Sequence, residues 1–136
     1  MERDRFKIEA PIMRDKRNRQ KMAVDPAGKP AVTHVKRLAR LPLGTLITAR
    51  LETGRTHQIR VHLASIGHPV LGDTLYAPKE FRDGPMMLHA AFLAFRHPRT
   101  QQPIELYAPP PAGFALNEDV QPMVVDWSAR GPALTW

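Results

Sequence analysis

The 136-residue chain contains no cysteine, which excludes disulfide bonds and cysteine-ligated metal sites and gives no sign of an oxidising compartment. No apolar run approaches the length of a membrane span, and the charged start of the chain leads into no apolar region of the signal-peptide kind. The six histidines show no spacing that suggests zinc. We therefore expect a soluble, cytoplasmic protein without a metal site.

Positive charge is abundant by contrast. Lysine and arginine outnumber aspartate and glutamate by 20 to 13, which gives a net charge of +7 and a pI of about 10.4. A balance of this size attracts polyanions, and nucleic acid is the commonest polyanion in a cytoplasm. The alternative is a basic surface that serves only solubility.

The middle of the chain carries the most specific pattern, a strand followed by a helix. The turn residues Thr53 and Gly54 follow an apolar run, and Thr56 can cap the amides at the start of a new helix. We predict this helix at about residues 56–66. Gly67 follows at the position where a helix end favours a residue with positive φ.

The side chains of this helix divide into an apolar stripe and a basic region. Ile59, Leu63 and Ile66 recur at helical spacing and are predicted to face the core. Arg55 and Arg60 lie near the helix start, which carries partial positive charge, so the region suits a phosphate or a carboxylate. A capped surface helix with solvated arginines is the alternative.

The residues before this helix predict strands and a basic loop. Residues 6–10 alternate as a strand, and residues 31–41 and 45–51 form a predicted hairpin. Between them lies a run without apolar period, which is either a solvated loop or a contact surface for phosphates. Its cations are Arg14, Lys16, Arg17, Arg19 and Lys21.

The residues after the helix predict a second hairpin. Residues 87–95 are apolar at nearly every position and favour a strand buried on both faces, with Leu88 and Phe95 in the core and His89 as a satisfied core histidine. The chain then returns through residues 104–107. We assign residues 1–116 to one portion of a domain and residues 117–136 to an irregular tail.

The central motif is similar to one in a known family. Gly-Arg-Thr-His-Gln-Ile-Arg-Val-His at 54–62, Gly-His-Pro at 67–69 and Gly-Asp-x-x-Tyr at 72–76 resemble the late motif of the RluA family of RNA pseudouridine synthases, the ribosomal large-subunit type. Other segments match in order, so that the resemblance covers roughly residues 6–111.

The resemblance implies a fold and a reaction. The fold would be α+β, a mostly antiparallel sheet with one main helix. These enzymes break the N-glycosidic bond of a uridine, turn the uracil over and rejoin it to the ribose through carbon, and they use no cofactor or metal. An aspartate acts at the ribose, a tyrosine packs near the base, and an arginine pairs with the aspartate. Arg60 matches that arginine.

Part of the family pattern is absent from these residues. The catalytic aspartate belongs to an Arg-Leu-Asp-x-x-Thr-Ser-Gly segment, which does not occur here. Asp73 belongs to the late motif, where a structural role in a turn is expected. The resemblance therefore implies the C-terminal part of a catalytic domain, with a complementary N-terminal half as a partner, and an Arg60 without its aspartate in this chain.

Several residues are thus candidates for function. The catalytic candidate is Arg60, and Tyr76 is predicted to line the pocket. The RNA-binding candidates are Arg55, His57, Arg14, Lys16, Arg17, Arg19 and Lys21. His57 and His62 are five residues apart, which does not direct them to one metal ion, so packing or hydrogen bonding is expected.

Three functions follow from these candidates. The first is an RNA pseudouridine synthase, acting on uridine in ribosomal RNA, whose aspartate lies outside this sequence. The second is a catalytically inactive RNA-binding remnant of such an enzyme. The third, which fits the charge but not the motif, is a module that binds another anion.

Overall fold

The computed structural model describes residues 4–42, 44–90 and 92–107. The chain divides into two compact units, Met1–Met87 and Leu88–Trp136, which we describe separately. Every strand pair is antiparallel, and the described residues contain one α-helix, which agrees with the predicted α+β class. The predicted tail, residues 117–136, lies outside the described residues, so its boundary stays a prediction.

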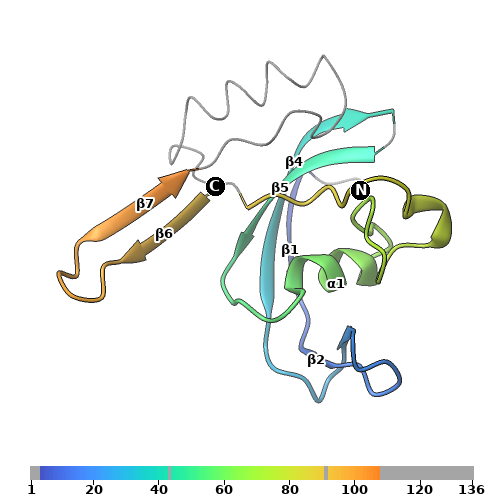
Figure 1. The fold of residues 1–136 in the computed structure, drawn as a ribbon, viewed down its shortest axis with the longest axis horizontal. Helices are drawn as coiled ribbons and strands as arrows, with labels where there is room; N and C mark the ends of the chain where they lie inside the picture. Colours follow the sequence, from blue (N-terminus) through green and yellow to red (C-terminus); the bar gives the residue numbers. More distant parts are fainter. Residues whose placement is uncertain (1–3, 43, 91, 108–136) are drawn as a thin grey trace. The chain divides into compact units, whose positions relative to one another are not determined.

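A three-stranded sheet is the base of the first unit. Strand β4 (Val32–Leu41) lies between β1 (Arg5–Glu9) and β5 (Gly44–Leu51), as Figure 1 shows. Thr33 and Val35 are fully buried and alternate with less buried neighbours, as expected for a strand with one face on the core. The predicted strand at 6–10 and the predicted hairpin are both confirmed within a residue or so at their ends.

A second, shorter hairpin carries the basic loop. Strand β2 (Ile12–Arg14) pairs with β3 (Met22–Val24), and residues 15–21 connect them. Sequence analysis predicted the loop but not its flanking strands, because alternation over three residues is too short to recognise. The hairpin is held to the following turn by the backbone bonds Ile12 N–H to Lys29 O and Lys29 N–H to Ile12 O, both 2.9 Å.

Helix α1 spans Gln58–Ser65 and is shorter than the predicted 56–66. The prediction that Thr56 caps it was wrong, because the capping position is His57, in the left-handed region at φ 55° and without a side-chain cap. The side-chain oxygen of Gln58 instead accepts a hydrogen bond from the amide of Arg55 at 3.0 Å. This amide in the turn before the helix therefore has its partner inside the helix. Gly67 has φ 83°, as predicted.

The core of the first unit forms where α1 packs on the sheet. Ile8, Val35, Leu63 and Val70 form one buried cluster, with Ile59 packed against it. The predicted burial of Ile66 was wrong: it is 39% exposed, because it follows the last helical residue, where the chain leaves the helix.

Polar groups also fix α1 on β4. Gln58 Nε2 donates to Val32 O and to Thr33 Oγ1, both at 2.9 Å. Thr33 Oγ1 lies 2.8 Å from His62 Nδ1, and His62 Nε2 lies 2.9 Å from Ala10 O. A carbonyl only accepts, so Nε2 donates to Ala10 O. Both ring nitrogens of the buried His62 thus have a hydrogen-bond partner, the role expected for it.

The second unit contains one described hairpin. Strand β6 (Phe92–Arg96) pairs with β7 (Pro103–Tyr107), which confirms the predicted return of the chain. The predicted strand start at residue 87 was wrong, because the pairing begins only at Phe92 opposite Tyr107. Leu88, predicted in the core, is 38% exposed, and His89 precedes the strand. The side chain of Phe95 lies outside what the structure describes.

Within the described ranges, no helix has both the length and the apolar character needed to cross a membrane. The same residues include no group of three or more histidine, aspartate or glutamate side chains arranged to hold a metal ion.

The buried polar network predicts a specific sensitivity of stability. Replacing Gln58 with alanine removes the donor to Thr33 Oγ1 and one of the two donors to the Val32 carbonyl, which also accepts the Glu52 amide at 3.1 Å. We therefore expect the free energy of unfolding to fall by about 1–3 kcal/mol. Urea unfolding followed by circular dichroism measures this. The exposed Gln20 is the matched control, and its alanine variant should change stability by less than about 0.5 kcal/mol. Equal effects of the two substitutions would contradict the assigned role of Gln58.

Candidate functional site

Arg60 and Asp73 form a forked ion pair at the surface of the first unit. Arg60 Nε donates to Asp73 Oδ2 at 2.9 Å, and Arg60 Nη2 donates to Asp73 Oδ1 at 2.8 Å. The Asp73 side chain is fully buried, whereas that of Arg60 is 15% exposed. The expectation that Arg60 lacks a partner in this chain was therefore wrong, because the turn after α1 returns a carboxylate to it.

Asp73 also determines the shape of that turn. Its Oδ1 accepts the amides of Leu75 at 2.9 Å and Tyr76 at 3.2 Å. The preceding Gly72 has φ 80°, and a Cβ there would lie 2.1 Å from the Pro85 carbonyl oxygen, so only glycine fits. The structural turn role expected for Asp73 is thus what the structure shows.

Hydrogen bonds keep Asp73 ionised. Burial by itself raises the pKa of this carboxyl, but the hydrogen bond from Arg60 and the two backbone amides outweigh burial, so the pKa lies below its usual value. The same hydrogen bond raises the pKa of Arg60. Because the folded-state pKa of Asp73 is depressed, the pair stabilises the fold at neutral pH, and this contribution is lost as the pH falls through that pKa.

Tyr76 lies against the pair and connects it to β3. Its hydroxyl accepts the amide of Met22 at 2.7 Å and lies 2.9 Å from His57 Nδ1. The Arg60 guanidinium carbon is 5.2 Å from the centre of the Tyr76 ring, and Lys21 Nζ is 5.8 Å from it. Burial raises the pKa of Tyr76, so the hydroxyl keeps its proton at neutral pH.

His57 is the remaining member of this group. Burial, together with the nearby positive charge of Arg60, lowers the pKa of His57 and favours the neutral imidazole. In a neutral His57, Nδ1 accepts a hydrogen bond from the Tyr76 hydroxyl, so the imidazole proton is on Nε2. The structure thus brings together four sequence candidates, Arg60, Tyr76, His57 and Lys21, which with Asp73 we call the Arg60 group.

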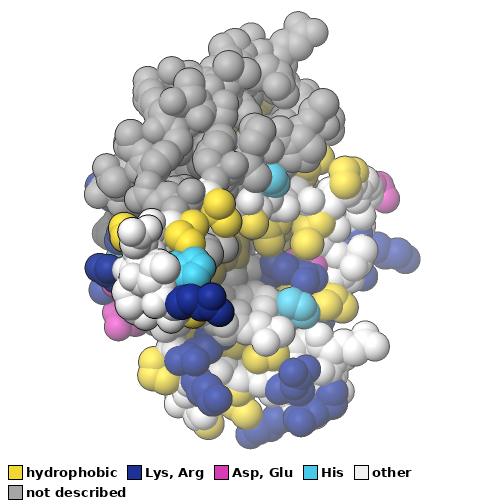
Figure 2. Space-filling view, turned by 60° about the vertical axis from the view of Figure 1, so that its left-hand side comes forward, with side chains coloured by type: hydrophobic (Ala, Val, Ile, Leu, Met, Phe, Trp, Pro, Cys, Tyr) yellow, Lys and Arg dark blue, Asp and Glu magenta, His cyan; other side chains and the backbone are white. Residues whose placement is uncertain are grey.

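The basic loop is a structured turn rather than a loose chain. Asp15 Oδ1 accepts the amides of Arg17 at 2.7 Å and Asn18 at 3.0 Å, which lowers the pKa of Asp15. Arg14 Nη1 donates to Arg19 O at 2.7 Å. Lys16 and the loop arginines remain exposed. Figure 2 shows lysine and arginine gathered at the lower end of the first unit, where β2 lies in Figure 1.

Arg55 lies apart from the Arg60 group. Its Nε donates to Pro30 O at 3.0 Å, so this side chain extends toward the turn before β4. Sequence analysis missed the Asp73 partnership and the contact of the Met22 amide with Tyr76. The Gly-Asp-x-x-Tyr spacing signals the turn, because an aspartate side chain there can accept the amides two and three residues later, but it gives no sign of the ion pair with Arg60.

Chemically, the Arg60 group is suited to bind and orient an anion. Asp73 has its oxygens occupied by Arg60 and two amides, so it is not available as a nucleophile. Arg60 Nη1, by contrast, donates no hydrogen bond within the part of the chain that the structure describes.

Comparisons with known proteins agree on one family. A sequence profile of the RNA pseudouridylate synthase family matches residues 1–65. The uncharacterized RNA pseudouridine synthase YlyB of Bacillus subtilis is 50% identical over 109 residues, which make up 79% of this chain and 36% of the relative. Ribosomal large subunit pseudouridine synthase D of Haemophilus ducreyi is 42% identical over 85% of this chain and 41% of its own length.

A solved structure supports the same assignment. Human RNA pseudouridylate synthase domain containing 1 superposes with a TM-score of 0.72 at 31% identity, over 82% of this chain and 50% of that one. The chain therefore spans half or less of the length of each of these relatives. Together with the Arg60 motif, these similarities confirm the resemblance of this chain to the RluA family of RNA pseudouridine synthases.

Proposed function

We propose that this chain provides the arginine half of the active site of an enzyme that isomerises uridine to pseudouridine in ribosomal RNA. The aspartate that acts at the ribose would come from a segment outside these 136 residues, a complementary N-terminal half of the catalytic domain. Arg60 would then orient two carboxylates, Asp73 within the chain and the catalytic aspartate across the interface between the halves.

The geometry of Arg60 carries this proposal. Asp73 holds the guanidinium through Nε and Nη2, which fixes the plane of the group and leaves Nη1 for a second acceptor. A guanidinium fixed in this way can keep a second carboxylate ionised and aimed, because a nearby cation lowers the carboxyl pKa. Lysine in place of Arg60 offers no fork and could not serve both carboxylates.

The family likeness and the charge support RNA as the substrate. A relative carries the name of a ribosomal large subunit pseudouridine synthase, and the net charge of +7 favours a polyanion. The basic loop presents its cations on an ordered turn, where they can contact phosphates without reading base identity. The RNA-binding candidates Arg14, Lys16, Arg17, Arg19 and Lys21 all lie in or beside this loop.

The charge of the loop predicts salt-dependent RNA binding. Replacing Arg14, Lys16, Arg17 and Arg19 with alanine should lower the slope of log affinity against log salt by about 0.7 for each phosphate that is no longer neutralised. Filter binding of a structured ribosomal RNA fragment across a salt series measures the slope. Removing four exposed cations elsewhere, Arg5, Lys7, Lys79 and Arg99, is the charge-matched control. Equal reductions of the slope in both variants would show that only net charge matters.

If the active site is divided between two halves, catalysis should require both of them. The chain alone should form no pseudouridine, whereas mixing it with the N-terminal part of the Bacillus subtilis relative, which would supply the aspartate segment, should restore turnover. Carbodiimide-dependent reverse-transcription stops detect the product. In the mixture, Arg60→Ala should lower turnover about 10²–10⁴-fold, the rate equivalent of the ~3–5 kcal/mol at stake when a buried charge loses its partner.

Two variants make this catalytic test specific. Arg60→Lys should recover little of the activity, because a lysine ammonium cannot make the forked pair of hydrogen bonds. Substitution of the exposed Arg99 by alanine should leave the activity at the wild-type level. Stops produced by the 136-residue chain alone would contradict the division of the site. No turnover in the mixture, with RNA binding retained, would favour the inactive RNA-binding remnant instead.

A further inference from the structure

A basic pocket lies between the β2–β3 hairpin and the segment that leads into α1. Its volume is about 440 Å³, within the range that holds a small organic ligand. It is lined by Ile12, Met13, Arg14, Met22, Ala27, Gly28, Lys29, Gly54, Arg55 and Thr56. Three of these residues are cations and none is a carboxylate, so the pocket as a whole favours an anion.

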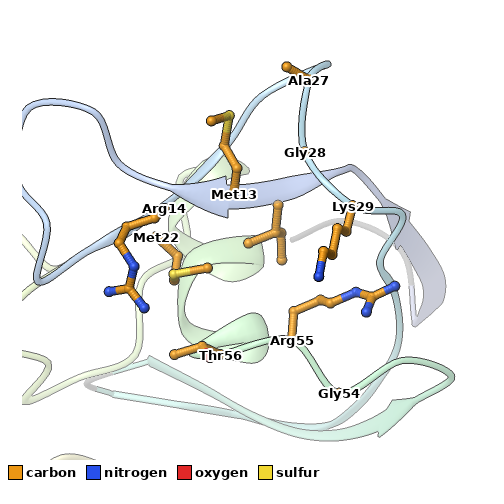
Figure 3. A pocket seen from close by; sticks show the side chains of 10 residues that line it. Met13, Arg14, Met22, Ala27, Gly28, Lys29, Gly54, Arg55 and Thr56 are labelled. Atoms are coloured by element: carbon orange, nitrogen blue, oxygen red, sulfur yellow. The ribbon is translucent and has the colours of Figure 1, made fainter.

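The cations are arranged around an apolar floor. Figure 3 shows Lys29 and Arg55 at one side of the pocket and Arg14 at the other, with Met22 between them. Ile12 and Met22 supply apolar surface, and methionine sulfur makes favourable contacts with aromatic rings. Met13 precedes Arg14 on β2, so its side chain points to the other face of the hairpin from that of Met22, which pairs with Arg14. The pocket therefore offers positive charge at its edges and a surface for a flat ring between them.

Backbone contacts hold the walls in place before any ligand arrives. Arg55 Nε donates to Pro30 O at 3.0 Å, which leaves its two terminal nitrogens for a ligand. Gly28 packs so closely on Ile12 that a Cβ would lie 2.5 Å from the Ile12 carbonyl carbon. Arg14 Nη1 donates to Arg19 O at 2.7 Å. These contacts order part of the wall before binding, which lowers the entropy cost of binding.

Met22 connects this pocket to the Arg60 group. Its side chain lines the pocket, and its amide donates to the Tyr76 hydroxyl at 2.7 Å. A ligand that contacts the Met22 side chain would therefore touch a residue whose amide is bonded to the Arg60 group. Nucleotides of one RNA strand could occupy both places.

We propose that the pocket binds one nucleotide of the RNA substrate, a neighbour of the target uridine, with its phosphate at Lys29 and Arg55 and its base against Met22. The inference rests on the proposed function for the identity of the ligand. It adds a second nucleotide site that grips the strand beside the reacting one. Stacking on side chains and contacts to phosphate are the usual means of holding an unstacked RNA base.

Methionine-methyl NMR of the full chain tests the pocket directly, with uridine 5′-monophosphate as the probe. The aromatic base should shift the methyl signal of Met22 and leave those of Met86 and Met87 unchanged. Inorganic phosphate, which has no ring, should not produce this shift. A short oligouridine RNA should produce it at lower concentration, because further phosphates contribute.

Charge variants complete the test. The double variant K29Q/R55Q should weaken binding of uridine 5′-monophosphate about tenfold or more, as expected when charged hydrogen bonds are removed. The variant K79Q/R99Q removes two exposed cations outside the pocket and should leave binding unchanged. Equal weakening by both variants would overturn the proposal.

The two probes separate this inference from the proposed function. If the RNA binds with the predicted salt dependence but neither probe shifts Met22, the nucleotide pocket is wrong and the proposed function stands. If the mononucleotide shifts the Met22 methyl signal but ribosomal RNA does not bind, the pocket stands as a nucleotide site and the proposed function fails.

Discussion

The ion pair between Arg60 and Asp73 is the interaction on which the rest of the site depends. It joins α1 to the turn that follows it, and Asp73 uses its remaining capacity to accept two amides of that turn. The turn places Tyr76, whose hydroxyl meets the Met22 amide of β3. Removing either partner would leave a charge without compensation, at a cost of about 3–5 kcal/mol when that charge is buried.

The opposite side of α1 is held by polar contacts as well. Gln58 and His62 hydrogen-bond to Thr33 and to backbone carbonyls, while Leu63 joins the apolar cluster under the sheet. The helix therefore cannot rotate without breaking contacts on two sides. Its eight residues would be too few to form a stable helix by themselves. Arg60 thus has a fixed direction because the helix that carries it is fixed by its neighbours.

Much of this architecture could be predicted from sequence, for identifiable reasons. The strands at 6–10, 31–41 and 45–51 alternate or fit strand composition over enough residues to be recognised, and Gly67 marks the helix end. The start of α1 could not be predicted, because it depends on the Gln58 side chain folding back on the Arg55 amide. The β2–β3 strands are too short to show a period. The partner of Arg60 lies 13 residues away across a turn, beyond the reach of helical spacing rules.

The central claim is that Arg60 holds Asp73 ionised and aligned, and the titration of Asp73 tests it most directly. The carboxyl carbon can be followed by ¹³C NMR from neutral to acid pH in the wild-type chain and in an Arg60→Gln variant. We predict that the pKa of Asp73 lies below the ordinary aspartate value in the wild type and rises in the variant. The variant lacks the positive charge of Arg60, which opposes the effect of burial on this pKa. An ordinary pKa in the wild type, or one unchanged by the substitution, would contradict this account.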